Sequence, residues 1–193
     1  QDLKVGDTII TDGTECLALS DYKEPQPMIF ASIYPEDADD FENLRDALSK
    51  LRLNDPSLSY EVESSESLGR GFRAGFLGML HVEIISERLQ REYNLDLIFS
   101  TPSVPYRVKF AGGDVRLFHA PSEIPDEHLL QWIEEPWIAM KIITPKSFLG
   151  TIMKILERIS GIFGITEYLG DDRVVFTYEA PLRSIVVDFY DHL

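Results

Sequence analysis

Residues 67–81 read Ser67-Leu68-Gly69-Arg70-Gly71-Phe72-Arg73-Ala74-Gly75-Phe76-Leu77-Gly78-Met79-Leu80-His81. Up to Phe76, apolar residues alternate with small or polar ones, as is typical of a β-strand, and from Leu77 onward their spacing becomes helical. Glycines inside a strand let a second backbone or a helix approach closely. The stretch therefore predicts a glycine-rich strand that leads directly into an amphipathic helix.

The glycines of this strand fit packing better than phosphate binding. Their spacing, Gly69-x-Gly71-x-x-x-Gly75, is not the dinucleotide fingerprint, and no Lys-Ser or Lys-Thr pair follows as a P-loop requires. We interpret Gly69, Gly71, Gly75 and Gly78 as structural residues of one signature. His81 completes this signature as a helix-start residue rather than a metal ligand.

The sequence around this stretch predicts one β-α-β-β-α-β unit. A strand at 28–34 leads to a helix that Asn54-Asp55-Pro56 ends, because the residue before proline avoids the helical region. Residues 59–64 alternate as a second strand, the glycine-rich strand follows, and Asn94 ends the next helix before a strand at 95–101. The side chains expected to point inward from that helix are Leu80, Ile84, Ile85 and Leu89. This order is the split β-α-β plan of a ferredoxin-like domain.

Residues 136–193 repeat the pattern without its last strand. A strand at 137–143 is followed by a helix, for which Thr144 is the expected cap and Pro145 the first position. Two strands meet at the turn Gly170-Asp171-Asp172, and a second helix is expected to open at Pro181. The expected inner face of the first helix comprises Phe148, Ile152, Ile155, Leu156 and Ile159. We therefore expect an α+β chain of two ferredoxin-like units, the second interrupted, in a piece of a longer protein.

The segment between the two units, residues 104–135, is less regular. Strand-like runs at 106–110 and 115–119 flank Gly112-Gly113-Asp114, which predicts a hairpin. A proline-rich acidic connector is expected at 121–127.

Composition limits the classes of protein and site. The 193 residues carry a net charge of −15, which argues against binding led by a broad basic footprint on nucleic acid, and no binding to DNA is expected. The single cysteine, Cys16, excludes an internal disulfide framework. No apolar run reaches the ~18 residues of a membrane span. No histidine has a partner at ligand spacing, and the acidic pairs occur in turns and linkers, so neither a metal site nor a catalytic residue is predicted.

The few basic residues are the candidate contact residues. Arg70 and Arg73 are three apart on the predicted strand and therefore on opposite faces, with Arg70 expected on the polar side and Arg73 paired with an acid. Lys146, Lys154 and Arg158 belong to the second unit, the last two one turn apart on its first helix. Solvated charge is the simpler interpretation, and contact with phosphate is the functional one.

A resemblance covers nearly all 193 residues. The run at 71–85, Gly-Phe-Arg-Ala-Gly-Phe-Leu-Gly-Met-Leu-His-Val-Glu-Ile-Ile, is similar to the third-domain signature of the LepA (elongation factor 4) family of translational GTPases. The flanking runs at 22–30, 53–60 and 101–104 agree with it. Ala74 stands where the family usually has another small residue or a thiol.

This resemblance implies a domain organisation and a function. Residues 1–22 would end a β-barrel second domain, 23–103 form the third domain, 104–135 a hairpin and connector, and 136–193 most of the fifth domain. The implied parent protein binds GTP and magnesium on a separate domain, binds rRNA and ribosomal proteins, and moves tRNAs back by one codon. The family implies a cytoplasmic location and allows peripheral association with the cell membrane.

Two alternatives stay open at this point. A stand-alone pair of ferredoxin-like folds would bind a small ligand or regulate an enzyme by dimerising. Elongation factor G is the close competitor among translation factors, although the segment at 106–136 is too short to hold its fourth domain.

Overall fold

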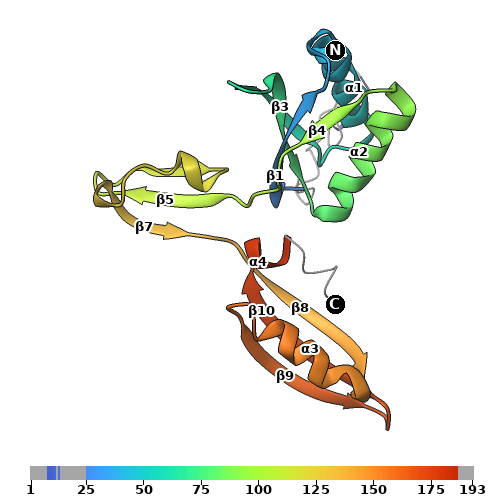
Figure 1. The fold of residues 1–193 in the computed structure, drawn as a ribbon, viewed down its shortest axis with the longest axis vertical. Coiled ribbons are helices and arrows are strands. Elements are labelled where there is room, and N and C mark those ends of the chain that lie inside the picture. The colour runs from blue at the N-terminus through green and yellow to red at the C-terminus, as the bar shows by residue number, and fades with distance from the viewer. Residues whose placement is uncertain (1–7, 12, 14–24, 187–193) are drawn as a thin grey trace. The chain divides into compact units, whose positions relative to one another are not determined.

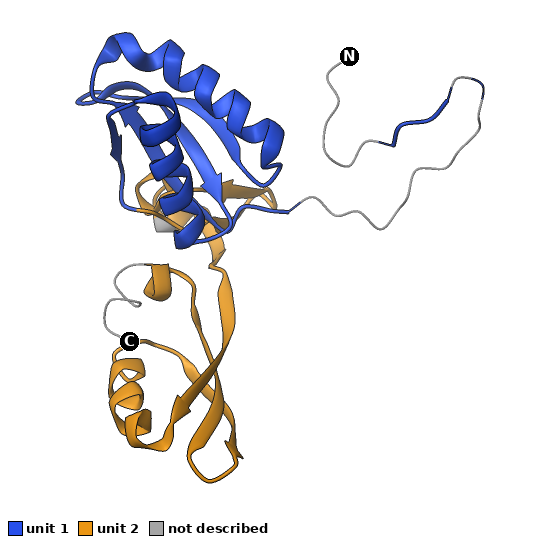
Figure 2. Cartoon of the chain, turned by 90° about the vertical axis from the view of Figure 1, so that its right-hand side faces the viewer, with its two compact units in different colours: residues 1–101 blue, residues 102–193 orange. Residues whose placement is uncertain are grey.

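The computed structural model describes residues 8–11, 13 and 25–186. The chain forms two compact units, residues 1–101 and 102–193, coloured blue and orange in Figure 2, and each is described by itself. Most of the predicted end of a β-barrel at residues 1–22 lies outside the described residues.

The first unit has the predicted β-α-β-β-α-β order. Its elements are β1 (Ile29–Pro35), a 3-10 turn (Ala38–Asp40), α1 (Phe41–Asn54), β2 (Ser59–Ser65), β3 (Gly69–Phe76), α2 (Met79–Tyr93) and β4 (Leu97–Phe99). The strands form one antiparallel sheet in the order β2-β3-β1-β4, with both helices on the same face (Figure 1). A ferredoxin-like fold is thereby confirmed for this unit.

Alternation along β3 supplies the core under the helices. Phe72, Ala74 and Phe76 are buried, as expected for every second residue of a strand that faces a helical layer. The buried helix residues include Leu44, Leu48 and Leu51 on α1, and Val82, Ile85 and Leu89 on α2.

The predicted inner face of α2 is partly wrong. Leu80 and Ile84 are 69% and 46% exposed, whereas Ile85 and Leu89 are buried as expected. The helix carries two apolar stripes at helical spacing, and the sheet accepts the one that contains Val82. The expected end at Asn94 is confirmed: its φ of 53° is the left-handed conformation that often closes a helix.

The second unit begins with a three-stranded sheet. The predicted hairpin is confirmed as β5 (Tyr106–Phe110) and β6 (Val115–Phe118). A third strand, β7 (Leu130–Glu134), pairs with the other edge of β5 and gives the order β6-β5-β7. Sequence analysis assigned this third strand to a connector; the 3-10 turns Pro121–Glu123 and Glu127–Leu129 precede it.

The same unit contains a second sheet under a helix. Its elements are β8 (Trp137–Pro145), a 3-10 turn (Lys146–Phe148), α3 (Leu149–Leu156), β9 (Ile162–Leu169), β10 (Arg173–Pro181) and α4 (Arg183–Val186). The order β8-β10-β9 is that of the first three strands of a ferredoxin-like sheet, and within the described part β8 pairs with β10 alone. The core under α3 contains Ile152, Leu156, Phe176, Tyr178, Ala180 and Ile185.

Three local predictions for this sheet are wrong. Thr144 does not cap a helix, because β8 continues through Pro145, which lies opposite Arg173 of β10. Phe148 is 58% exposed, since it belongs to the 3-10 turn that precedes α3 rather than to the inner face. Pro181 ends β10 instead of opening the next helix.

Candidate functional site

The glycine signature is built into the close contacts of β3. A methyl group at Gly71 would overlap the carbonyl oxygen of Ile33 and the ring of Tyr34, and one at Gly75 would overlap the ring of Pro27. These contacts explain why the strand has no side chain at either position.

The other two glycines of the signature, Gly69 and Gly78, are not in close contact with a neighbouring strand or ring. Gly69, the first residue of β3, has a φ of +76°, a conformation that favours glycine. Gly78 meets nothing within 4 Å of an added methyl group and has an extended φ of 175°. No steric contact therefore requires a glycine at this last position.

His81 connects the start of α2 to the end of α1. Its Nδ1 accepts a hydrogen bond from the Leu77 backbone N–H at 3.1 Å, and its ring packs edge-on against Phe76 at a centroid distance of 5.4 Å. Since Nδ1 is the acceptor, Nε2 carries the hydrogen and lies 2.9 Å from Oδ2 of Asp55. The ring therefore holds two helix ends together.

The carboxylate of Asp55 has a partner at each oxygen: Ser57 at Oδ1 and the His81 imidazole at Oδ2. Burial raises its pKa, but the hydrogen bonds from Ser57 and the adjacent imidazole outweigh burial, so the pKa of Asp55 lies below its ordinary value. Its Oδ1 accepts the Ser57 backbone N–H at 3.0 Å as well as the Ser57 hydroxyl. This cluster connects the start of α2 to the residues that follow α1.

Arg70 lies on the helix side of β3, and its predicted place on the polar side is wrong. It shares the face of Phe72, two residues along the strand. Its guanidinium carbon lies 3.9 Å from the centre of the Phe41 ring, which stacks on Phe72 at 4.8 Å. The side chain is nevertheless exposed at the end of the strand, so it covers Phe41 and still faces solvent.

Arg73 is on the opposite face of β3, as predicted from the spacing. Its Nη2 donates to Oε1 of Glu63 on β2 at 2.6 Å, and both side chains are 21% exposed. The pair is therefore mainly a cross-strand structural contact.

The three cations of the second unit have different surroundings. Lys146 donates from Nζ to the Asp171 carbonyl at 2.6 Å and lies 5.1 Å from the Tyr168 ring, so it closes the turn between β9 and β10. Lys154 is exposed on α3. Arg158 lies beyond the end of α3 at Leu156, in the following turn, which corrects its predicted place on the helix.

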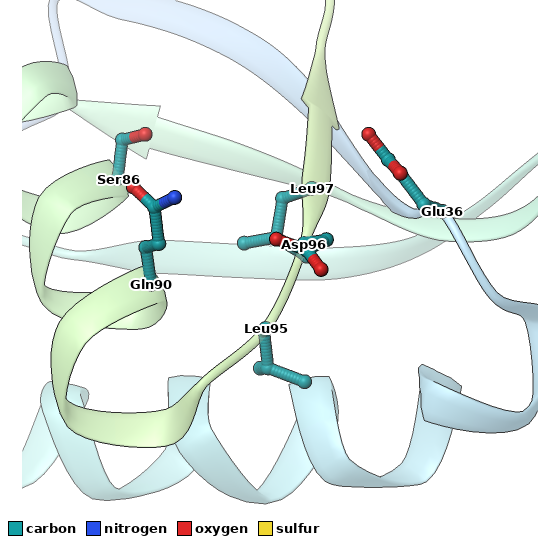
Figure 3. Close-up of a pocket in the computed structure, with 6 residues that line it drawn as sticks. All are labelled: Glu36, Ser86, Gln90, Leu95, Asp96 and Leu97. Atoms are coloured by element: carbon teal, nitrogen blue, oxygen red, sulfur yellow. The ribbon is translucent and has the colours of Figure 1, made fainter.

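A shallow hollow of about 160 Å³ lies beside β4. Figure 3 shows Ser86 and Gln90 projecting from α2 toward Leu97, with Glu36 beyond β4 in this view. Its lining is polar and acidic, and among the described residues no three side chains of metal-ligating type gather in one place. The hollow offers neither a nucleophile with an adjacent base nor a cluster suited to a cation.

These positions do not form a catalytic centre. Arg70 and Arg73 diverge on the two faces of β3, while Lys146, Lys154 and Arg158 belong to the other unit. Sequence analysis missed the partners that define their roles, Phe41 and Glu63, and also the strand β7, whose short run between prolines and acids resembled a connector. Within residues 25–186, none of the helices is long and apolar enough to cross a bilayer.

Both units match models of translation-factor domains. Residues 24–101 match elongation factor G domain III, and residues 132–193 match the elongation factor G C-terminus. These two matches indicate a translation elongation factor that contains both kinds of domain.

Comparison with curated relatives shows which family of elongation factors the chain is similar to. The chain is 51% identical over 193 residues to elongation factor 4 of Sulfurimonas denitrificans, and 48% identical to those of Cyanothece sp. and Thermosynechococcus vestitus. The matches cover 99% to 100% of this chain and 32% of each relative. The chain belongs to the elongation factor 4 (LepA) family and spans about a third of the length of these relatives.

A solved structure agrees with the fold. A crystal structure of a Thermus thermophilus protein aligns with a TM-score of 0.52 at 19% identity, over 93% of this chain and 40% of the other. At that identity the likeness supports the fold alone.

Proposed function

We propose that this chain is the ribosome-binding part of a translational GTPase of the elongation factor 4 type. The observation that carries the proposal is identity of about one half along the whole chain, including the segment between the two units, to proteins named elongation factor 4. In this proposal the parent protein hydrolyses GTP with magnesium on another domain and moves tRNAs back by one codon.

The residues of this chain do not fit a nucleotide site. The sequence contains no Gly-x-x-x-x-Gly-Lys-Ser/Thr loop to hold phosphates, and the described side chains offer no metal-ligating group of three. The role we assign to the chain is therefore binding and relay. Residues 23–103 act as the third domain, 104–135 as the hairpin and connector, and 136–193 as most of the fifth domain. The parent protein works in the cytoplasm and associates peripherally with the membrane.

Contact with rRNA is assigned to the exposed cations. Because the chain has a net charge of −15, attraction to RNA must be local. Arg70, Lys154 and Arg158 are exposed, and Lys146 lies at a turn; these are the proposed phosphate contacts. Arg73 is mostly covered by its pair with Glu63, so its contribution is to hold β3 in place.

Charge reversal in the full-length protein tests this assignment. Arg70→Glu and the double variant Lys154→Glu/Arg158→Glu should each weaken ribosome binding and reduce the slope of log affinity against log salt by about one per lost phosphate contact. Arg91→Glu is the matched control, because Arg91 is exposed on α2 and pairs with Glu87. Equal affinities for all variants across salt concentrations would show that these cations are only solvated.

The comparisons do not favour the stand-alone ligand-binding module, because relatives named elongation factor 4 match along the whole chain and this chain spans 32% of their length.

A further inference from the structure

One face of the β6-β5-β7 sheet combines an aromatic ring, two cations and apolar side chains. The strand register places Lys109 opposite both Val115 and Trp132, and Arg107 opposite both Leu117 and Glu134. These six residues therefore share one side of the sheet, named here the Trp132 face. The other side carries Val108, which is fully buried, and the contact between Phe110 and Phe118.

The Trp132 face is open to solvent. Val115 and Leu117 are 51% and 56% exposed, and Trp132 is half-buried. Arg107 and Lys109 lie 5.9 Å and 6.0 Å from the centre of the Trp132 ring, the outer limit of a cation–π contact. The ring is thus flanked by positive charge without being tightly covered by it.

Charge on this face differs from that of the whole chain. The six residues of the Trp132 face include two basic residues, Arg107 and Lys109, and one acidic residue, Glu134, in a chain of net charge −15. Arg107 donates from Nε to Glu134 at 2.7 Å, whereas Lys109 has no ion pair among the described residues. A partner that brings phosphate would therefore meet one available ammonium and one guanidinium held by a carboxylate.

We infer that the Trp132 face binds an unpaired segment of RNA. A base stacks on Trp132, its backbone phosphate contacts Lys109, and Arg107 exchanges Glu134 for a second phosphate. Aromatic rings flanked by cations are the usual platform for single-stranded nucleic acid, because every base has a π-face and every linkage has a charge. Val115 and Leu117, on β6, extend the apolar surface on which the bound RNA would lie. The inference rests on the proposed function, since it names the kind of ribosomal element that this segment would contact.

Substitutions of Glu134 and Lys109 should change the affinity for RNA in opposite directions. Its carboxylate holds Arg107 and repels phosphate, so Glu134→Gln should strengthen RNA binding several-fold. Lys109→Gln should weaken it and reduce the salt slope by about one. Lys141→Gln is the matched control, because Lys141 is also exposed on a strand, β8, but lies outside the Trp132 face.

The experiment uses Trp132 as its own reporter. The chain contains two tryptophans, so Trp137→Phe leaves Trp132 as the only one. Titration of this 193-residue variant with a short oligouridylate should quench the fluorescence saturably. Trp132→Ala in the wild-type chain should weaken binding, measured by anisotropy of a labelled oligouridylate, about tenfold or more. Trp132→Phe should retain most of the affinity, which separates loss of stacking from loss of fold.

Two outcomes would overturn the inference, and one would support it. Equal quenching by polyglutamate would indicate an acidic peptide as the partner. Absence of quenching by oligouridylate, in a chain that still binds ribosomes, would refute the RNA contact at this face and leave the proposed function intact. Saturable quenching that Lys109→Gln and Glu134→Gln shift in opposite directions supports the contact, even if ribosome binding by this chain fails and the proposed function is withdrawn.

Discussion

The imidazole of His81, on the first turn of α2, lies 2.9 Å from the carboxylate of Asp55, the C-cap residue that directly follows α1. The two helices of the first unit are therefore connected at one end by a polar contact, in addition to their shared apolar core. The backbone N–H and the hydroxyl of Ser57 bind the same carboxylate, so removing the Asp55 carboxylate would leave these two donors without their acceptor and the imidazole without its partner.

Asp55→Asn should destabilise the first unit at neutral pH by about 1.5–3 kcal/mol, the range for hydrogen bonds to a charged group. The folded pKa of Asp55 is below the ordinary value of 3.8, so its stabilisation is complete above that value and is lost as pH falls through the lower, folded pKa. The difference from wild type should therefore shrink below about pH 4. Urea denaturation at a series of pH values measures it. Asp46→Asn, exposed on α1, is the control; a difference independent of pH would contradict this origin.

The pair between Arg73 and Glu63 should contribute a coupling energy of about 1–2 kcal/mol, because both side chains are largely shielded from water. A double-mutant cycle with Arg73→Met and Glu63→Gln measures it by denaturation. The exposed pair of Arg91 and Glu87 should give less than about 0.5 kcal/mol in the same experiment. Equal coupling in the two cycles would show that burial does not strengthen the first pair.

Gly71→Ala should unfold or severely destabilise the first unit, because the added methyl group meets a backbone carbonyl that cannot move without disrupting β1. Gly78→Ala should change stability by no more than about 1 kcal/mol, since open space surrounds that position. Thermal denaturation of both variants tests the contrast. Similar melting temperatures would contradict the close packing of β3 on β1.

Tyr178→Phe should destabilise the second unit by about 1 kcal/mol, because the hydroxyl reaches the carbonyls of Leu156 and Ile159 at 2.9 Å and 2.8 Å. Burial raises the pKa of Tyr178 above 10.0, so the stabilisation is complete below pH 10 and is lost as pH rises through the raised folded pKa. Alkaline denaturation of the variant should lack that component. Tyr168→Phe, 65% exposed, is the control and should behave as wild type.

The fold could be predicted from the sequence where the spacing of apolar residues and glycines was compatible with only one arrangement. The strand at residues 69–76 has apolar side chains on one face only, so the face that packs against the helices could be predicted. On α2, however, Leu80 and Ile84 form a second apolar stripe, and helical spacing alone does not reveal which stripe the sheet covers. Thr144-Pro145 looked like a helix start because local preferences favour it there, whereas pairing with β10 kept these residues in a strand.

The candidate contact residues were harder to predict than the fold. The spacing of Arg70 and Arg73 gave opposite faces correctly, and alternation with Phe72 puts Arg70 on the apolar face. What the sequence does not show is that the Arg70 side chain covers the ring of Phe41, which lies almost thirty residues away in the sequence. The Trp132 face could not be predicted, because it exists only once β7 pairs with β5. Non-local strand pairing is the information that single-sequence patterns lack.

The central claim is that this chain binds the ribosome as part of an elongation factor 4-type GTPase. Its most direct test is the binding of the 193-residue chain to 70S ribosomes at a series of salt concentrations. The account predicts saturable binding at low ionic strength that weakens steadily as salt rises, with Arg91→Glu as wild type and Lys154→Glu/Arg158→Glu weaker. Absence of saturable binding at the lowest salt concentration, by a chain whose circular dichroism shows it to be folded, would contradict the claim.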